Sequence, residues 1–265
     1  MLAAKTQEIV IIGAGRLASH LGSAFYKQGL NMVQVYNRTE EKGKKLAGRI
    51  GTTFTADIHE ITPNADIYIL AVSDSVLVDL AAELRLKDKL VVHTSGTMGM
   101  DVLTPISANI GVFYPLQTFS STRRIDFRKI PVCIEGNSGV SEQMLADLAG
   151  KITQRIYILS SDNRRFLHLG AVFTSNFTNF IYTITEELLK EHEIPFNLLE
   201  PLILQTARNI KYGDLFQYQT GPAIRGDTKV LEKHREMLSS YTDYLEIYNL
   251  ITQNIIKHKS VHGKL

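Results

Sequence analysis

The stretch that decides the fold reads Ile9-Val-Ile-Ile-Gly-Ala-Gly-Arg-Leu-Ala18. Four apolar β-forming residues run directly into Gly13, Gly15 and Ala18, which is the spacing of a dinucleotide-binding fingerprint with alanine in its third place. Gly13 lets the chain turn sharply out of a strand, Gly15 leaves room for a pyrophosphate against the backbone, and Ala18 lets the next helix pack closely. A helix that begins at Arg16 can then point its free N–H groups at the phosphates.

The context of these glycines favours a cofactor site over a plain structural turn, because a strand pattern precedes them and a helix pattern follows. The residues that we predict to bind the cofactor here are Gly13, Ala14, Gly15, Arg16 and Leu17.

Composition limits the class of protein. The chain has 265 residues, of which 44% are hydrophobic and 21% charged, with a net charge of +2. These values are typical of a globular protein and exclude nucleic-acid or membrane binding through bulk charge. The single cysteine, Cys133, allows no intrachain disulfide, and no apolar run approaches the roughly 20 residues that span a bilayer. We expect a cytoplasmic protein that binds a small molecule, with no nucleic acid, membrane or metal as a partner.

Strand and helix patterns alternate from residue 8 to about residue 158. Expected strands after the first lie at 32–36, 66–72, 89–93, 110–114, 130–134 and 155–158, and expected helices at 16–28, 40–50, 77–84 and 141–148. This rhythm predicts an α/β fold with a doubly wound, Rossmann-type sheet that binds its ligand at the carboxyl ends of the strands.

The rhythm stops after Ser160. Helical spacing replaces it at 162–192, 196–209, 228–237 and 240–257, which predicts an all-helical C-terminal domain. We therefore expect an NADP-binding Rossmann-like domain at 1–160 and a helical domain for substrate binding and dimerisation at 161–265. Apolar residues at helical spacing in the last helix form either a core stripe or the face of a homodimer.

The choice of cofactor depends on the end of the second strand, which reads Asn37-Arg38-Thr39. An NAD enzyme normally has an acidic residue here for the ribose hydroxyls, whereas Arg38 can pair with a 2′-phosphate. The sequence therefore favours NADP(H), with a solvated turn residue as the alternative role for Arg38. The following loops add the predicted cofactor contacts Val72, Ser73, Asp74 and Ser95, although Ser73 and Ser75 could simply be helix caps.

Polar groups that could act on a substrate come from both halves of the chain. His93 and Ser95 follow a strand where cofactor and substrate should meet, and Gly96 and Pro115 would line the same pocket. On an ideal helix His168, Ser175, Asn176 and Asn179 fall within roughly 100° of one another, either as site residues or as satisfied core groups. Arg225 precedes Asp227 in a Gly/Pro-rich turn, either as a carboxylate clamp or as part of a local cap and ion pair.

The chain resembles the reductases of the 6-phosphogluconate-dehydrogenase-like superfamily, above all the NADP oxidoreductases in which a Rossmann-like domain precedes an uncharacterised helical domain. The resemblance covers nearly the full length. It rests on Gly13-Ala-Gly15, Asn37-Arg38-Thr39, His93-Thr-Ser-Gly96, Tyr114-Pro-Leu-Gln-Thr-Phe119, Ser175-Asn176-Phe177 and Thr220-Gly-Pro-Ala-Ile-Arg-Gly-Asp227. Pyrroline-5-carboxylate reductase and ketopantoate reductase are similar in plan.

One position departs from that resemblance. In the hydroxyacid dehydrogenases and usual ketopantoate reductases, a lysine lies one helical turn before the asparagine of the interdomain helix and donates the proton. Val172 stands there in this chain. His168 and His93 are the predicted substitutes, because imidazole exchanges protons near neutral pH.

These residues predict that NADPH reduces the C=O or C=N of a small carboxylate held between the two domains. Asn176 would hydrogen-bond the heteroatom, His168 or His93 would supply the proton, and Arg225 would hold the carboxylate. A ketopantoate-like 2-keto acid is the favoured substrate, and a cyclic imine of the pyrroline-5-carboxylate type is the alternative. A non-catalytic NADP-binding sensor is the rival from another class. Deazaflavin-coenzyme reductases share the fold, and Arg38 favours NADPH over that coenzyme.

Overall fold

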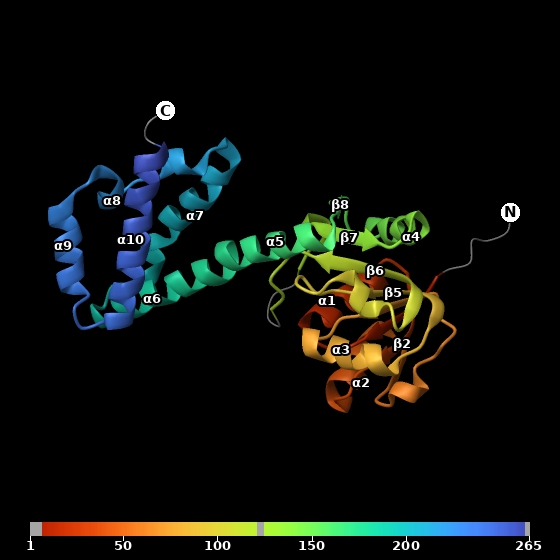
Figure 1. The fold of residues 1–265 in the computed structure, drawn as a ribbon. Helices are drawn as coiled ribbons and strands as arrows, with labels where there is room; N and C mark the ends of the chain where they lie inside the picture. The colour runs from red at the N-terminus through yellow and green to blue at the C-terminus, as the bar shows by residue number, and fades with distance from the viewer. Residues whose placement is uncertain (1–6, 121–124, 263–265) are drawn as a thin grey trace. The chain divides into compact units, whose positions relative to one another are not determined.

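The structure is a computed structural model that describes residues 7–120 and 125–262. The chain divides into two compact units, of which the first ends at Asn176 and the second begins at Phe177 (Figure 1). The boundary predicted at residue 160 follows the change in secondary structure instead and stays a prediction. Over the described residues, no helix combines the length and the apolar character needed to span a membrane.

The first unit is built on one sheet of eight strands in the order β3-β2-β1-β4-β5-β6-β7-β8. The strands are β1 (Glu8–Ile12), β2 (Asn31–Tyr36), β3 (Thr53–Thr55), β4 (Ile67–Leu70), β5 (Lys87–His93), β6 (Ser107–Pro115), β7 (Val132–Gly136) and β8 (Ile156–Ile158). Strands β1 to β6 run parallel to one another. This arrangement confirms the predicted Rossmann-type sheet.

Helices cover both faces of this sheet, which explains why its central strands are apolar throughout. They are α1 (Arg16–Lys27), α2 (Glu40–Ile50) and α4 (Gly139–Gly150) on one face and α3 (Asp74–Glu83) on the other, and α5 (Ser161–Ala171) follows β8. Alternate residues of β1 enter different cores. Ile9 and Ile11 pack with residues of α1, α2 and α4, whereas Val10 and Ile12 pack with residues of α3. Burial on both faces fixes β1 at the centre of the sheet.

Two features of the sheet differ from the sequence-based expectation. Strand β7 runs antiparallel to β6, and β8 then runs parallel to β7. The described part of the β6–β7 connection holds only the short 3₁₀ helix Phe127–Lys129, whereas the crossover between parallel strands usually contains an α-helix. The edge strand β3 was not predicted, because three residues with two threonines give little pattern.

The second unit is helical, as predicted, and contains no strand among its described residues. Its α-helices are α6 (Thr178–Glu191), α7 (Glu200–Arg208), α8 (Pro222–Arg225), α9 (Thr228–Met237) and α10 (Thr242–His262). The predicted helix at 162–192 forms as α5, a π-helix (Val172–Phe177) and α6 in direct succession. The helix predicted at 196–209 begins instead as the 3₁₀ helix Phe196–Leu199, and α7 starts just before Pro201, which suits a first-turn position.

Candidate functional site

The turn between β1 and α1 is fixed from two sides. The Gly13 N–H donates a hydrogen bond to the Tyr36 carbonyl oxygen at 2.7 Å. Gly13 has a φ of +111°, and a Cβ atom there would lie 2.4 Å from the Ala71 carbonyl oxygen. Glycine is therefore required both for the backbone conformation and for the approach of β4.

Gly15 has a different reason to be glycine. It is the N-cap of α1 with an ordinary φ of −69°, and no side chain caps the helix. A Cβ atom built on Gly15 meets no atom within 4 Å. The space beside it is therefore open, and the N–H groups of the first turn of α1 border it. A phosphate group fits this cradle and would be excluded by a side chain.

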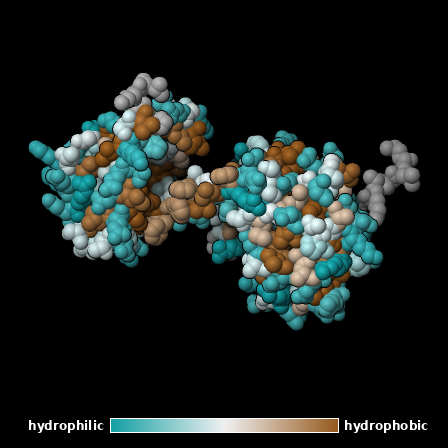
Figure 2. Space-filling view, in the orientation of Figure 1, coloured by the Kyte–Doolittle hydropathy of each residue, from teal (hydrophilic) through white to brown (hydrophobic). Residues whose placement is uncertain are grey.

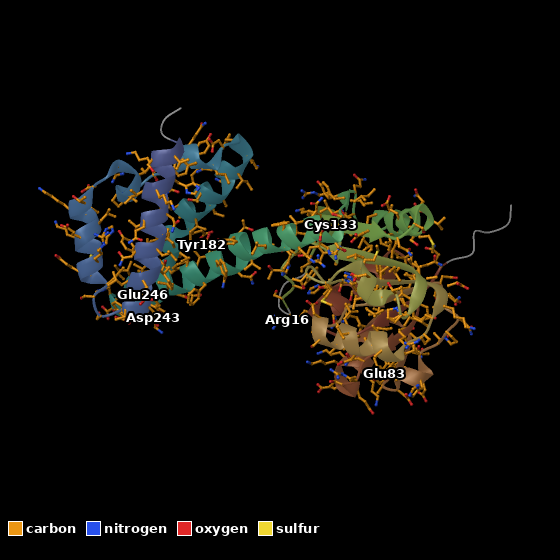
Figure 3. The ribbon with its side chains drawn as sticks, in the orientation of Figure 1. Arg16, Glu83, Cys133, Tyr182, Asp243 and Glu246 are labelled. Atoms are coloured by element: carbon orange, nitrogen blue, oxygen red, sulfur yellow. The ribbon has the colours of Figure 1, made fainter. Side chains whose placement is uncertain are left out.

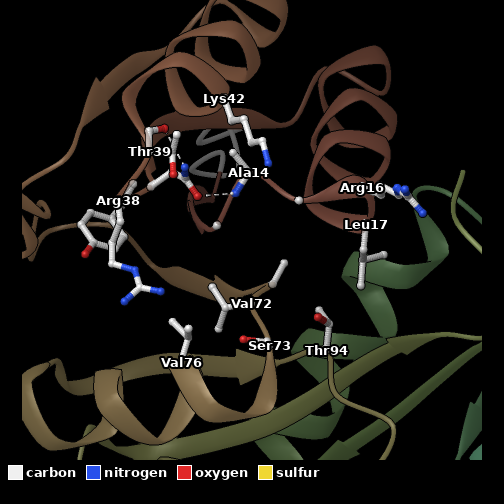
Figure 4. Close-up of a pocket in the computed structure, with 15 residues that line it drawn as sticks. Ala14, Arg16, Leu17, Arg38, Thr39, Lys42, Val72, Ser73, Val76 and Thr94 are labelled. Atoms are coloured by element: carbon white, nitrogen blue, oxygen red, sulfur yellow. Dashed lines mark hydrogen bonds between the residues drawn. The ribbon is translucent and has the colours of Figure 1, made fainter. Parts of the chain in front are cut away.

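A pocket of about 430 Å³ opens over this turn (Figure 4). Its lining residues come from the carboxyl ends of β1, β2, β4 and β5 and from the helices that follow them. They are Gly13, Ala14, Gly15, Arg16, Leu17, Tyr36, Asn37, Arg38, Thr39, Lys42, Ala71, Val72, Ser73, Val76 and Thr94. Ten of the twelve predicted cofactor contacts are thus brought together. The other two, Asp74 and Ser95, do not line this pocket.

Asn37 ties the two loops of the pocket together. Its Oδ1 accepts a hydrogen bond from the Ala14 N–H at 3.0 Å, and its Nδ2 donates to the Thr39 carbonyl oxygen at 2.7 Å. The amide side chain therefore holds the turn after β1 against the turn after β2. Asn37 therefore contributes to the phosphate cradle by fixing the backbone conformation of these two turns.

The pocket is positively charged on the side of β2 and α2. Arg38 is exposed and its guanidinium group extends into the pocket (Figure 4), where its charge partly offsets the rise that burial causes in the pKa of Tyr36. Lys42 also lines the pocket, in the first turn of α2 and four residues after Arg38. Sequence reasoning missed Lys42, although its spacing from Arg38 was a usable signal. Among the described residues that line the pocket, none is acidic.

The loop after β5 leads from this pocket to a second group of polar residues. Thr94 lines the pocket, and Ser95 follows it with an Oγ that accepts hydrogen bonds from the N–H groups of Thr97 and Met98 at 3.1 and 3.0 Å. The Thr97 hydroxyl in turn donates to the Asp74 carboxylate. Ser95 and Asp74 therefore fix the shape of this loop. Ser73 is not a side-chain cap for α3 and instead contacts Ser75 through its hydroxyl at 3.3 Å.

His93 is not suited to donate a proton. It is completely buried, its Nδ1 accepts the Ser95 N–H at 3.1 Å, and its Nε2 lies 3.2 Å from the Gly99 carbonyl oxygen. Burial, assisted by the positive charge of Arg164, lowers the pKa of His93 to about 4. The imidazole is therefore neutral at pH 7 and holds the loop in place. Between the two predicted proton donors, the geometry leaves His168.

His168 lies against the same loop from helix α5. Its Nδ1 is 3.0 Å from the Tyr114 hydroxyl oxygen, and the two rings pack edge to face. A Cβ atom on Gly96 would lie 2.5 Å from the same Nδ1. Gly96 thus serves to admit the imidazole ring. Pro115 is buried and ends β6 beside Tyr114. The loop that begins in the pocket at Thr94 therefore reaches His168 two residues later.

A buried ion pair holds α5 in this position. Arg164 is one turn before His168 and its side chain is only 1% exposed. Its Nη1 donates to the Glu135 carboxylate at 2.7 Å, and its Nη2 donates to the Met98 carbonyl oxygen. Burial favours the neutral form of Glu135, but hydrogen bonds from Ser161 and Arg164 outweigh it and lower the pKa. Nothing in the sequence around Arg164 marked it as buried.

The remaining predicted residues lie on or beyond the π-helix. Ser175 contacts Thr118 through its hydroxyl at 3.0 Å, and Asn176 is exposed. The angles of an ideal α-helix, which placed these residues on the face of His168, do not hold across a π-helix with its i→i+5 hydrogen bonds. Asn179 and Arg225 belong to the second unit, and their role at the site stays a prediction.

Asp227 caps the helix that follows the Gly/Pro-rich turn, which was one of the local roles predicted for this turn. It is the N-cap of α9, and its side chain accepts the Val230 N–H at 3.2 Å. Among the described ion pairs there is none between Arg225 and Asp227. Arg225 is exposed, and its role as a carboxylate clamp stays a prediction.

Comparison with known proteins shows the family to which this chain belongs. A Rossmann-like domain family matches residues 2–117, and a domain of unknown function, DUF2520, matches residues 130–255. The crystal structure of a "putative NADP oxidoreductase" from Bacteroides fragilis is 40% identical, with a TM-score of 0.88, and the match covers 95% of this chain and 98% of that one. The chain belongs to this oxidoreductase family. A search of curated proteins found no match.

More distant members of the fold are also similar to this oxidoreductase. An imine reductase from Myxococcus stipitatus in complex with NADP⁺ is 16% identical, with a TM-score of 0.66 over 96% of this chain and 95% of that one. A pyrroline-5-carboxylate reductase from Coxiella burnetii is 20% identical, with a TM-score of 0.56 over 95% and 99%. At these identities the likeness shows the fold alone.

We predict that Gly15→Val abolishes cofactor binding by the oxidoreductase without unfolding it. The new side chain meets no protein atom, but it fills the space that a phosphate would occupy. NADPH fluorescence titration should show an affinity loss of more than about tenfold, or 1.4 kcal/mol, with an unchanged melting temperature. Gly48→Val, at another open glycine on α2, is the control and should bind normally. Retained binding by Gly15→Val would contradict the cradle.

We also predict that Arg38→Ala and Lys42→Ala weaken NADPH selectively. Each removes a charged hydrogen bond to the 2′-phosphate, so the KM for NADPH should rise about 10- to 100-fold, while the KM for NADH changes little. Lys44→Ala is the matched control, because Lys44 pairs with Glu40 at 2.5 Å on α2 and does not line the pocket. Equal losses for the two cofactors would contradict the assignment.

Proposed function

We propose that this NADP-dependent oxidoreductase reduces a small carboxylate substrate, with the C=O of a ketopantoate-like 2-keto acid as the favoured acceptor. The main support for the proposal is that the loop after β5 runs from the pocket to His168. Thr94 lines the basic pocket, and Gly96 contacts the His168 imidazole. NADPH supplies the hydride when bound, so a proton-exchanging side chain next to the nicotinamide end of the pocket supplies what the reaction still needs.

The protein residues then share the remaining tasks. Ser95 shapes the loop, and Gly96 and Pro115 form the wall on which the substrate would rest. His168 hydrogen-bonds the heteroatom and delivers the proton of one ring nitrogen, while its other ring nitrogen takes the proton of the Tyr114 hydroxyl, which water then restores. Asn176 donates a second hydrogen bond to the same atom, which stabilises the negative charge that develops there. Asn179 and Arg225 hold the substrate carboxylate.

A cyclic imine is the second candidate substrate. One observation favours it: Val172 takes the place of the lysine that related hydroxyacid dehydrogenases use as an acid. An imine can arrive already protonated and then requires no strong acid from the protein. The distant likeness to an imine reductase and to a pyrroline-5-carboxylate reductase supports testing this class.

The test is a panel of 2-keto acids, including ketopantoate, and cyclic imines, followed by NADPH absorbance. We expect substrate-dependent oxidation with a keto acid. Asn176→Ala should lower kcat by about 100-fold, as loss of a charge-stabilising donor does, and His168→Gln should also lower kcat. Asn163→Ala, an exposed position on α5, is the control and should keep full activity.

The possible results separate the hypotheses. Turnover of imines alone would select the second candidate. Tight NADPH binding with no oxidation of any substrate would overturn the enzymatic proposal in favour of a sensor. Full activity in Asn176→Ala would show that the assignment of Asn176 is wrong.

We also propose that the chain forms a homodimer through its helical unit. Few of the described side chains in this unit are buried, and Ile184, Ala223, Leu231 and Thr252 are the buried ones. Large apolar side chains on α7 and α10 are exposed, including Leu202 at 64% and Leu250 at 63%, and apolar surface is visible on this unit in Figure 2. A domain of this size needs more apolar burial to be stable.

Sedimentation analysis tests the dimer. We expect twice the chain mass of 29.7 kDa, because a second copy would cover the exposed apolar side chains. Leu202→Glu should shift the protein towards the monomer, whereas Lys233→Glu, at an exposed polar position of α9, should not. A wild-type protein that remains monomeric at micromolar concentration would overturn the proposal.

A further inference from the structure

The His168 ring is held on two sides by residues of the first unit. Tyr114, near the end of β6, places its hydroxyl oxygen 3.0 Å from His168 Nδ1. Gly96 lies so close that a Cβ atom there would be 2.5 Å from Nδ1 and 2.7 Å from Cγ. The imidazole therefore has little freedom to rotate away from Tyr114. Its orientation is set by the sheet and by the loop after β5.

The Tyr114 hydroxyl can donate a hydrogen bond to His168 Nδ1 or accept one from it, and the imidazole nitrogen is a stronger acceptor than the phenol oxygen. A phenol has one O–H to donate, and a neutral imidazole has one nitrogen that accepts and one that donates. Tyr114 is half-buried, and burial raises the pKa of its hydroxyl, so this hydroxyl keeps its proton. When the Tyr114 O–H donates to Nδ1, the hydrogen of the neutral ring lies on Nε2.

We infer that Tyr114 is a positioning residue that fixes His168 in the Nε2–H tautomer, and that this selects a substrate whose heteroatom can accept a hydrogen bond. A carbonyl oxygen has lone pairs for the Nε2–H. A protonated imine presents its own N–H at the same place, so two donors would face each other. The inference deepens the proposed function and rests on it for the reaction, but the tautomer itself does not depend on turnover.

Hydrogen bonds at the start of α5 hold the helix that carries His168 in place. Arg164 is one turn before His168, and it is bound to Glu135 on β7 and to the Met98 carbonyl oxygen in the loop after β5. The Ser161 hydroxyl donates to the same Glu135 carboxylate at 2.7 Å and accepts the Met100 N–H at 3.2 Å. The start of α5 is therefore attached to both the sheet and the loop. A side chain held from such a base can keep one tautomer and one orientation.

The first measurement is ¹⁵N NMR of histidine-labelled protein, which distinguishes the two neutral tautomers. The His168→Gln variant identifies the His168 signals. We expect the Nε2–H tautomer in the wild type and a mixture in Tyr114→Phe, which keeps the ring and removes only the hydroxyl. Tyr157→Phe, at a tyrosine that is 48% exposed on β8, is the matched control and should keep the wild-type tautomer.

The second measurement is the split between kcat and KM on the keto-acid substrate. Tyr114→Phe should lower kcat about five- to tenfold, as the loss of one neutral hydrogen bond does, with NADPH affinity and substrate KM nearly unchanged. Equal loss in NADPH affinity would indicate a merely structural role and overturn the positioning role. Tyr157→Phe should keep the wild-type kcat.

The possible results test the tautomer, the substrate class and the proposed function separately. An Nδ1–H tautomer in the wild type, or an unaltered tautomer in Tyr114→Phe, overturns the inference whether or not any substrate is turned over. Faster turnover of protonated imines than of keto acids overturns the substrate class. If no substrate is oxidised or reduced, the proposed function fails, and the NMR result still decides the tautomer.

Discussion

The site depends on how closely β4 approaches the turn after β1. Gly13 is the point of contact, because only a residue without a side chain can leave Ala71 in place and adopt a φ of +111°. The same turn is joined to β2 by the Gly13–Tyr36 hydrogen bond and by Asn37. Contacts with β2 and β4 therefore fix the backbone conformation of the turn that follows β1. The first turn of α1, which begins at Arg16 (labelled in Figure 3), borders the pocket as a consequence (Figure 4).

A second constraint acts at the other end of the site. Arg164 is buried, its Nε has no hydrogen-bond partner among the described residues, and Glu135 balances its charge. Breaking a buried ion pair by removing one partner costs about 3–5 kcal/mol. Cys133, two residues before Glu135 on β7, lies near enough that the Arg164 charge partly offsets the rise in its thiol pKa caused by burial. The buried Arg164 side chain joins α5 to the loop after β5. This structural role explains why a charge is buried here despite its cost.

Sequence reasoning succeeded where the signal was local. The fingerprint residues and Arg38 depend on spacing along one β-α-β unit, so most of the pocket could be named in advance, and Lys42 lay within reach of the same reasoning. The direction of β7 is linked to the structure of the connection that precedes it, where the described part holds only a short 3₁₀ helix, and it was not visible in strand patterns. Tyr114 and His168 are 54 positions apart, and no periodicity links β6 to α5. The burial of His93 likewise depends on residues from several elements.

The contrast between the two histidines shows why residue type alone does not identify a proton donor. His93 and His168 border the same loop, and both are candidate proton donors when judged by residue type alone. His93 has both ring nitrogens occupied by the backbone of its own loop, and burial beside the Arg164 cation keeps it neutral. His168 is half-buried and its partner is a hydroxyl. The fold thus uses one imidazole to shape the loop and holds the other against Tyr114 at the surface of the sheet unit, so the two histidines differ in burial and in the groups that contact their ring nitrogens.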